Sequence, residues 1–373
     1  MRTVELSYNV LRRGAYFGKL QASEDGGATI RGDSGAEIKT ALSGSFVPLV
    51  LDADGREVEA DWLSDEIQPV LTIDGEDYPL GVFAASSLPL SEEANVESMR
   101  LETMDRCWRV RETRAEARLY FAAGTNYVAA VEQLLVAAGI SVVLATPTDR
   151  TLAEDREWDV GASHLTVANQ LLGEINYNPL YFTKDGYAVI EPASVPTAEK
   201  IRHRISTSPD EIRAGADPVD PIMPAVTRDM DVYNAPNVFI CTCANPDKSG
   251  NMIATAMNTN PQSPLSISRR GRRIVEVERL DNIASQQELQ TYAERKRNMS
   301  MIRAERITVH TALLPNYSLG DVVGLHLKYE IDDGQHTREE ELDALCVLRA
   351  YTMELRVGGT MTLELERVVL NLD

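Results

Sequence analysis

Residues 158–192 read WDVGASHLTVANQLLGEINYNPLYFTKDGYAVIEP, and this stretch decides the fold of the middle of the chain. Ser163 stands where the N-cap of a helix is expected. After it, apolar residues recur at helical spacing: Leu165, Ala168, Leu171, Leu172 and Ile175. Two strand-like runs, 180–182 and 187–190, then flank a turn at Lys184-Asp185-Gly186 that needs a glycine. The stretch predicts a helix followed by a β-hairpin, and it offers no candidate nucleophile, phosphate loop or group of metal ligands.

The length and composition are those of a globular protein. The chain has 373 residues, enough for about two to four domains that each bury a core. Its 43% hydrophobic and 25% charged residues are ordinary values. No apolar run approaches the roughly 20 residues of a membrane-spanning helix, and residues 1–20 lack the apolar core of a secretory signal. We therefore expect synthesis in a cytoplasm.

The charge balance is strongly acidic. The formal net charge is -20, from 57 acidic and 37 basic residues. This charge argues against nucleic-acid binding, which depends on Lys and Arg to neutralise phosphates. It fits a solvated surface, and it also fits a surface that must not adhere to a passing polyanion. Composition does not choose between these two interpretations.

One basic cluster interrupts this acidic chain, at Arg269, Arg270, Arg272 and Arg273. We predict that it is an exposed hairpin tip between strand-like runs 265–267 and 274–277, with Gly271 in the turn. The four arginines could contact phosphate or an acidic partner. Charge complementarity in so acidic a chain favours a subunit interface over nucleic acid.

The first part of the chain, residues 1–113, is predicted to be β-rich. Strand-like runs occur at 4–10, 45–51 and 70–73. The clearest hairpin is 70–83, where an Asp-Gly pair supplies the positive φ angles of a tight turn. Many short strands at this spacing predict a barrel or a sandwich.

The rest of the chain alternates between the two kinds of structure. Residues 114–199 predict a small α/β module, in which a helix after Asn126 ends at Gly139 and the helix–hairpin stretch follows a short strand at 140–144. Residues 200–235 are proline-rich and read as a crossing segment that returns to the first domain or leads onward. From 236 the pattern is β again, with a helix at about 285–302 that opens on a capping box, Ser285 to Glu288. Acidic runs at 331–334 and 339–341 predict a solvated hairpin.

Candidate catalytic groups are few. Cys107 and His164 weakly resemble the catalytic pair of a cysteine peptidase. However, Cys107 lies in a predicted strand, and no third polar group that would orient the imidazole is evident. Cys241 and Cys243 could be half of a metal site, although buried strand thiols of a reduced protein are favoured because no second such pair exists. The five histidines are scattered, and the chain has no phosphate-binding or nucleophile-elbow motif. We therefore predict no catalytic, cofactor-binding or metal residues and no enzymatic activity.

Three passages together resemble the baseplate hub proteins of tailed-phage tails and related contractile injection machines. They are the hairpin 70–83, the module ending in 158–192, and the span 285–325 with its Leu-Pro-Asn-Tyr-Ser-Leu-Gly-Asp-Val-Val turn. The Gly-Asp-Val-Val part of that turn, residues 320–323, is the most specific of these. The resemblance covers most of the chain.

The resemblance implies a mainly β fold with α+β insertions, in which two antiparallel β-barrel domains accompany a small α/β module. The first barrel would be 1–113, completed by 200–235, and the second would be 236–373. A homotrimer would then form a pseudo-sixfold ring that adapts the sixfold tail tube to a threefold central spike and lines the DNA-ejection channel.

The partners implied by the resemblance are further copies of the chain, tail tube or distal tail ring proteins, the central spike or tip protein and the tape-measure protein. DNA would pass without specific binding. The expected location is the virion tail, assembled in the host cytoplasm. Many hub proteins continue into a lysozyme, peptidase or receptor-binding region where this chain stops, so we expect a separate protein to supply any wall-degrading activity. The alternative is a tail-associated cell-wall hydrolase or glycan-binding module.

Overall fold

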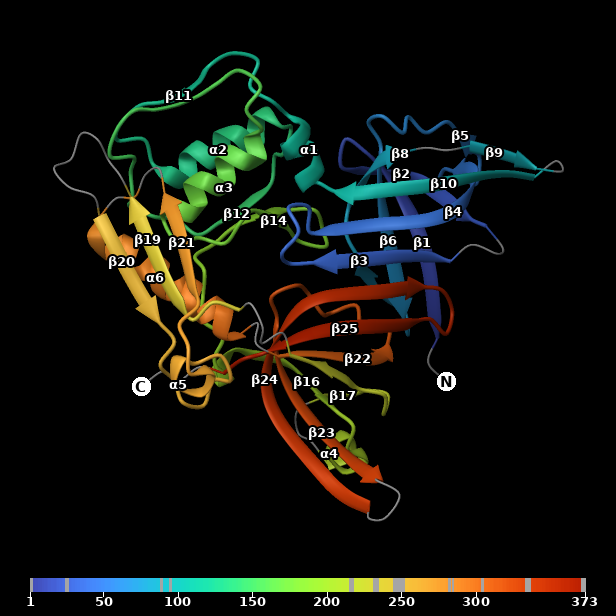
Figure 1. Ribbon diagram of the computed structural model, residues 1–373. Coiled ribbons are helices and arrows are strands. Elements are labelled where there is room, and N and C mark those ends of the chain that lie inside the picture. Colours follow the sequence, from blue (N-terminus) through green and yellow to red (C-terminus); the bar gives the residue numbers. More distant parts are fainter. Residues whose placement is uncertain are drawn as a thin grey trace.

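The computed structural model describes residues 3–23, 27–87, 90–93, 96–214, 218–230, 235–243, 252–280, 283, 285–302, 305–332 and 337–369. Two β-rich bodies lie one beside the other, and a helical module and a smaller sheet with its own helix flank them (Figure 1). The predicted fold class, mainly β with α+β insertions, is confirmed.

The first barrel is a closed ring of six antiparallel strands. Each strand pairs with the next, and the last pairs again with the first: β1 (Val4–Arg12), β2 (Ala15–Ala22), β4 (Thr40–Leu51), β10 (Val96–Asp105), β8 (Phe83–Ser87) and β6 (Glu66–Ile73). The predicted hairpin is present, because β6 turns into β7 (Glu76–Pro79) through Asp74 and Gly75, whose φ angles are 51° and 89°. Short strands β5 (Glu57–Val58) and β9 (Leu90–Glu93) extend the sheet. Alternate residues of these strands fill the barrel interior.

The second β body is also a ring, but it uses the crossing segment. Its antiparallel strands are β22 (Arg306–Ala312), β25 (Thr360–Arg367), β24 (Thr337–Leu355) and β23 (Val322–Asp332). Two parallel pairings then add β16 (Ile201–Ser206) and β17 (Val219–Pro221). A bridge from Ile222 to Thr311 returns the chain to β22, with which β18 (Thr227–Asp229) also pairs.

The prediction that residues 200–235 complete the first barrel is therefore wrong. The first barrel closes from strands between Val4 and Asp105 alone, and β16, β17 and β18 all pair within the second ring. The segment is also less irregular than its prolines suggested, because it holds η1 (Ala198–Lys200) at its start and α4 (Pro209–Ala214) between β16 and β17. Pro221 ends its strand, so these prolines bound short strands rather than exclude them.

A single strand joins the two rings. β3 (Ala28–Asp33) pairs with β4 on one side and with β24 on the other, both antiparallel. The result is one continuous sheet of 17 strands, and buried side chains from both rings belong to one core. The two bodies are thus held by a backbone ladder as well as by side-chain packing.

The inserted module contains residues 158–192, where a helix and a β-hairpin are predicted. Two helices, α2 (Tyr127–Ala137) and α3 (His164–Glu174), pack together over a small sheet of β12 (Val143–Ala145), β15 (Ala188–Ile190) and β14 (Tyr181–Phe182). The predicted hairpin is confirmed, with Gly186 at φ 82° between β14 and β15. The outer loop carries β11 (Leu119–Phe121) and β13 (Arg156–Trp158).

Two local predictions in this module need correction. Ser163 occupies the N-cap position of α3, but its hydroxyl donates to the main-chain oxygen of Arg111 instead of capping the helix (2.8 Å). Cys107 begins a helix, α1 (Cys107–Glu112), rather than lying in a strand. The cause is the carboxylate of Asp105, which accepts from the amides of Cys107 (2.8 Å) and Thr40 (2.7 Å) and turns the chain out of β10.

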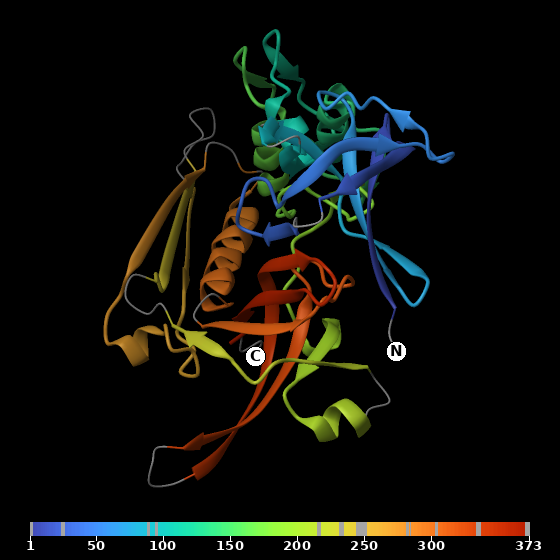
Figure 2. The same ribbon diagram turned by 90° about the vertical axis from the view of Figure 1, so that its right-hand side faces the viewer.

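Residues 236–302 form a separate small unit rather than the first half of a barrel. A three-stranded sheet has the order β20 (Met252–Met257), β19 (Val238–Cys243) and β21 (Val275–Leu280). Helix α6 (Gln286–Ile302) lies against one side of this sheet (Figure 2), where Cys241 and Cys243 are buried, as predicted for strand thiols. Ser285 caps α6 as predicted, but the Glu288 carboxylate does not complete the capping box and instead pairs with Arg150 of the inserted module (2.7 Å).

Candidate functional site

The Leu-Pro-Asn-Tyr-Ser-Leu-Gly-Asp-Val-Val turn lies where the second ring meets the inserted module. Its buried Asp321 accepts from the amide of Ser318 (2.7 Å) and closes the turn. The same carboxylate faces Arg202 (3.0 Å) and His203 (3.2 Å), which project from β16. The His203 ring stacks on Tyr317 with centroids 3.9 Å apart. The turn is therefore fixed to β16 by charge, hydrogen bonding and stacking at once.

The Lys184-Asp185-Gly186 turn of the inserted module reaches into this same place. The ammonium of Lys184 donates to the main-chain oxygens of Tyr317 (2.5 Å) and Pro315. Desolvation of the ammonium lowers the pKa of Lys184 to about 8, although the negative charge of Asp321 acts in the opposite direction. A lysine on a tight turn would ordinarily be solvated. The hydrogen bonds from Lys184 to two carbonyls therefore indicate a specific contact between the inserted module and the second ring.

The other side of the turn is tied to the first barrel. The main-chain oxygen of Gly186 accepts from Nη1 of Arg106 (2.6 Å). Arg106 in turn makes a two-pronged pair with the buried Glu66 of β6, with distances of 2.9 Å and 2.6 Å. A Cβ on Gly186 would lie 2.8 Å from both Arg106 Nη1 and a methyl of Val82. We call this set, Glu66, Arg106, Lys184, Gly186, Tyr317 and Asp321, the barrel junction.

The charged groups of the barrel junction hold the inserted module in place and are not arranged for catalysis. The carboxylates of Glu66 and Asp321 are each committed to a guanidinium or to main-chain amides, and the Lys184 ammonium is committed to carbonyls. Groups that do acid–base or nucleophilic work need a free face toward a substrate. These groups instead fix the inserted module against the first barrel and the second ring.

Cys107 and His164 do not have the properties of a catalytic nucleophile and its base. Cys107 is completely buried, and its sulfur contacts the main-chain oxygen of Leu180 (3.7 Å). Burial, reinforced by the negative charge of Asp105, raises the pKa of the Cys107 thiol well above its usual value. Nδ1 of His164 lies 3.3 Å from the main-chain oxygen of Leu134. A catalytic thiol needs a lowered pKa and access to substrate, and Cys107 has neither.

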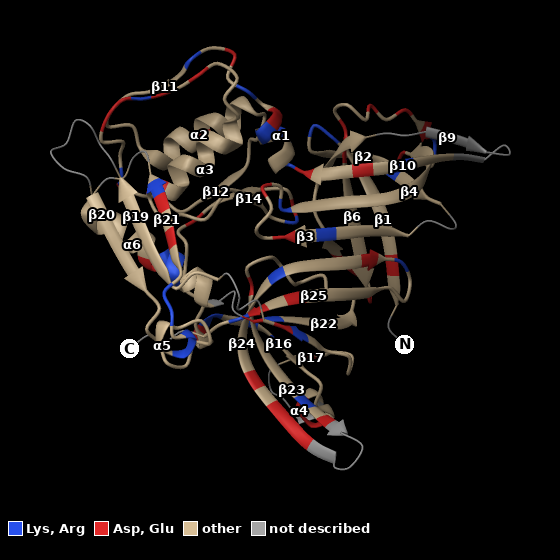
Figure 3. Ribbon diagram, viewed as in Figure 1, with Lys and Arg blue, Asp and Glu red and all other residues tan. Residues whose placement is uncertain are grey.

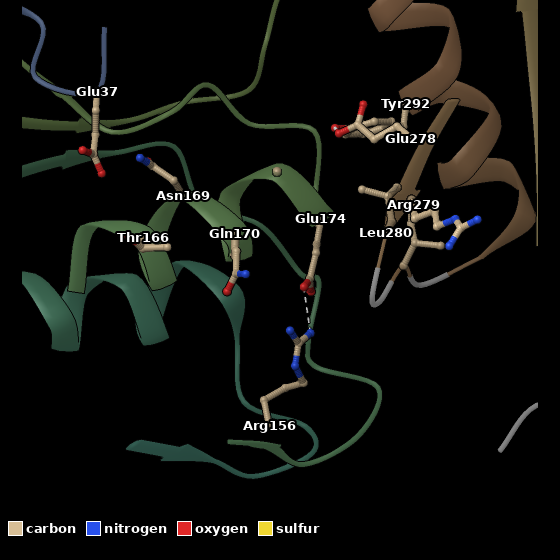
Figure 4. Close-up of a pocket in the computed structure, with 12 residues that line it drawn as sticks. Glu37, Arg156, Thr166, Asn169, Gln170, Glu174, Glu278, Arg279, Leu280 and Tyr292 are labelled. Carbon is tan, nitrogen blue, oxygen red and sulfur yellow. Dashed lines mark hydrogen bonds and ion pairs between the residues drawn. The ribbon is translucent and has the colours of Figure 1, made fainter. Parts of the chain in front are cut away.

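An open cleft of about 450 Å³ separates α3 from β21 and α6 (Figure 4). Two acids project toward it from opposite walls. Glu174 pairs with Arg156 (2.7 Å) and accepts from the hydroxyl of Tyr127 (2.8 Å). Glu278 pairs with Lys296 (2.8 Å) and accepts from Tyr292 (2.7 Å). Both carboxylates therefore have structural partners, which does not favour the acid and base roles of a glycosidase.

Solved structures match this fold over nearly its whole length. A 43 kDa tail protein of prophage MuSo2 from Shewanella oneidensis gives a TM-score of 0.62 at 11% identity, covering 98% of each chain. A tail protein from Neisseria meningitidis gives 0.59 at 15% identity, covering 97% of this chain and 96% of that one. The chain has the fold of phage tail proteins.

A prophage tail protein from Listeria monocytogenes shares the tail-protein fold, with a TM-score of 0.51 at 12% identity and coverage of 96% of this chain and 94% of that one. No protein-family model and no curated protein sequence matches. The resemblance to tail proteins drawn from the sequence is confirmed at the level of the fold. Within the described residues, no helix has both the length and the apolar character needed to cross a membrane.

The arginine cluster of this tail-protein fold is not a hairpin tip. Arg269 and Arg270 end a short helix, α5 (Ile267–Arg270), and Gly271 follows in the left-handed conformation at φ 63°. The helix forms because the Ser266 hydroxyl accepts from the amide of Arg269 (3.3 Å). The side chains of Arg269, Arg272 and Arg273 are exposed, while Arg270 reaches back to the main-chain oxygen of Ala235 (2.5 Å). Their role as an interface stays a prediction.

One cluster was not visible in the sequence. His326, Glu341 and Asp343 bring their ligand atoms within 4.8 Å of one another, in the way a cation site could. The register of β23 and β24 places His326 opposite Asp343 and puts Glu341 two positions along on the same face. His326 is already 2.7 Å from Asp343, so the observed arrangement is an ion pair on an acidic surface. Spacing along the chain cannot reveal such a group, because it depends on strand register.

Proposed function

We propose that the protein is a structural hub of a phage tail tip or baseplate. In this proposal three copies form a ring, and their six barrels adapt a sixfold tail tube to a threefold central spike. The shared fold with phage tail proteins supports a structural role in a tail. The proposed location is the virion tail, and the proposed role involves no catalysis.

The observation that carries this proposal is the ladder through β3. Because β3 pairs with β4 and with β24, neither ring can rotate without breaking backbone hydrogen bonds. The barrel junction adds a second connection from the inserted module to both rings. Two rings at fixed relative positions are what a trimer needs in order to present six similar units at its rim.

The domain organisation that we propose follows these connections. Residues 1–113 hold the first barrel and 114–199 the inserted module, as the sequence predicts. Residues 200–235 belong with the second ring, whose remaining strands begin at Arg306. The sheet and helix of 236–302 form a unit between them.

The proposed partners are further copies of this chain, the tail tube or distal tail ring, the central spike and the tape-measure protein. The net charge of -20 supports a channel through which DNA passes without binding. A basic channel face in the assembled ring would contradict this part of the proposal.

Sedimentation velocity of the purified protein tests the ring. We expect a species of three times the 41.2 kDa of one chain over a wide concentration range. A stable monomer throughout that range would contradict the hub. Zymography on cell walls tests the hydrolase alternative, with Cys107→Ala and His164→Ala as matched variants. A lytic band that either substitution abolishes would overturn the structural proposal.

A further inference from the structure

The β23–β24 hairpin projects beyond the second ring as an arm (Figures 1 and 2). The ladder from β16 ends at His326, and β25 begins its pairing with β24 only at Cys346. Among the described residues the outer arm is thus two-stranded, and its ladder extends to the pair Asp332 and Thr337. Two-stranded ribbons are only marginally stable in water without a covering surface, and free strand edges invite pairing.

One face of the arm is acidic. Strand alternation directs Glu339, Glu341 and Asp343 of β24 to the same side, with Glu330 opposite Glu339 on β23. The side chains of Glu339, Glu341 and Asp343 are 65%, 64% and 79% exposed. We call these four residues the acidic arm face. Lys328 and His326 of β23 share this face: Lys328 pairs with Glu339 (3.6 Å), and His326 contacts Asp343 (2.7 Å) and Glu341 (3.6 Å). Four carboxylates against one lysine leave an excess of negative charge, and Glu330 stands directly opposite Glu339, so a countercharge would stabilise the arm.

The small sheet carries the complementary surface. Helix α6 covers one face of this sheet, and the opposite face leaves apolar residues exposed, with Val275 52% and Val277 58% exposed. Ile253 and Met257 of β20 lie on this face as well, because both they and the β21 residues flank the same positions of β19. Exposed Arg279 lies on this face by the register of β21, and exposed Arg269 and Arg273 stand in α5 and in the segment that leads from α5 into β21. Apolar centres bordered by arginine are typical of protein–protein interfaces. We call this set of residues the basic sheet face.

We propose that the acidic arm face of one chain docks on the basic sheet face of a second copy. The proposal rests on the hub ring and names the surfaces that close it. Two different patches on one chain make a head-to-tail contact, and such a contact generates a ring when its rotation closes. In Figure 1 the small sheet lies at the left and the arm at the bottom, so the two patches are on different parts of the molecule, as a head-to-tail contact requires.

The charge distribution favours a second copy of the chain, rather than a nucleic acid, as the partner of the basic sheet face. The blue α5 region and the red outer part of β24 are separate on the molecule (Figure 3). A duplex approaching the arginines would meet the repulsion of a chain with a net charge of -20. A projecting arm instead brings an excess of carboxylates to the arginines, four acids against the one lysine, Lys328, of the acidic side.

Charge reversal tests the docking. The variants are Arg269→Glu with Arg273→Glu, Glu339→Lys with Glu341→Lys, and all four changes together. Glu57→Lys with Glu59→Lys is the control, because both residues are exposed on the first barrel, which carries neither surface. Circular dichroism melts verify that each variant folds, and sedimentation velocity gives the dissociation constant of the assembly.

We expect each double reversal to raise the dissociation constant at least tenfold, and the fourfold variant to recover most of that loss. The control should assemble as the wild type does. If the wild type assembles but the reversals leave the constant unchanged, or the fourfold variant does not recover, the docking is overturned while the ring stands. A monomeric wild type would overturn both. Fluorescence anisotropy that shows a DNA duplex held by the wild type and released by Arg269→Glu with Arg273→Glu would overturn the choice of occupant.

Discussion

Lys184 offers the sharpest test of the barrel junction. Lys184→Met keeps much of the side-chain volume and removes the ammonium that donates to the carbonyls of Tyr317 and Pro315. Each hydrogen bond from a charged donor contributes about 1.5–3 kcal/mol. Against this stands the cost of desolvating the ammonium. The pKa falls from 10.5 to about 8, which corresponds to at most about 3 kcal/mol. We therefore expect a net loss of about 1–2 kcal/mol in the free energy of unfolding at neutral pH.

The pH dependence of this loss has a definite sign. The folded chain releases the Lys184 proton near pH 8 and the unfolded chain near 10.5, so the unfolded state binds more protons between these values. Stability then rises with pH in this window. The wild type should accordingly gain up to about 3 kcal/mol relative to Lys184→Met as the pH rises through it.

Urea unfolding at several pH values, followed by tryptophan fluorescence, measures this difference. Lys200→Met is the control, because Lys200 is exposed and donates to one carbonyl, that of Val195 (2.8 Å). We expect it to change stability by less than about 0.5 kcal/mol, without the rise above pH 8. If the difference in unfolding free energy between wild type and Lys184→Met shrinks as the pH rises, the conclusion that desolvation lowers the pKa of Lys184 is refuted.

Three further outcomes test the junction and the chemistry. Gly186→Ala should cost more than Gly161→Ala by about 2 kcal/mol in urea unfolding. Both glycines have φ above 80°, but a Cβ meets Arg106 and Val82 only at Gly186, and equal losses would contradict the close approach. Glu66→Gln should destabilise by about 3 kcal/mol because the buried Arg106 pair is broken, whereas a loss no larger than that of the exposed Glu57→Gln would show that the pair contributes little. The Cys107 thiol should resist a thiol reagent at pH 8 until denaturant is added, since burial raises its pKa, and rapid labelling of the native protein at Cys107 would contradict its burial.

Local sequence patterns predict the elements well. The apolar stripe after Ser163 correctly predicts α3. The Asp74-Gly75 and Lys184-Asp185-Gly186 turns correctly predict their hairpins. These predictions depend only on neighbours within a few residues. Asn126 similarly caps α2, accepting from the amides of Val128 (3.0 Å) and Ala129 (3.2 Å).

Long-range pairing escapes such patterns. The strands of the crossing segment are only three to six residues long. β16 and β18 pair with strands about 120 and 80 residues onward, and β17 joins the ring beside β16, so no local period shows which ring they join. The capture of Lys184 by a turn more than 130 residues away is invisible for the same reason. The arginine cluster lies in a helix rather than at the predicted hairpin tip, and that helix has only four residues, too few for a periodic signal in the sequence.

In the proposed hub, three chains make a ring with six barrels. End-on class averages of the purified assembly by electron microscopy test it most directly. We predict a closed ring of threefold symmetry, with six similar densities around an open channel. Single 41.2 kDa particles, or a ring whose symmetry is not a multiple of three, would contradict it.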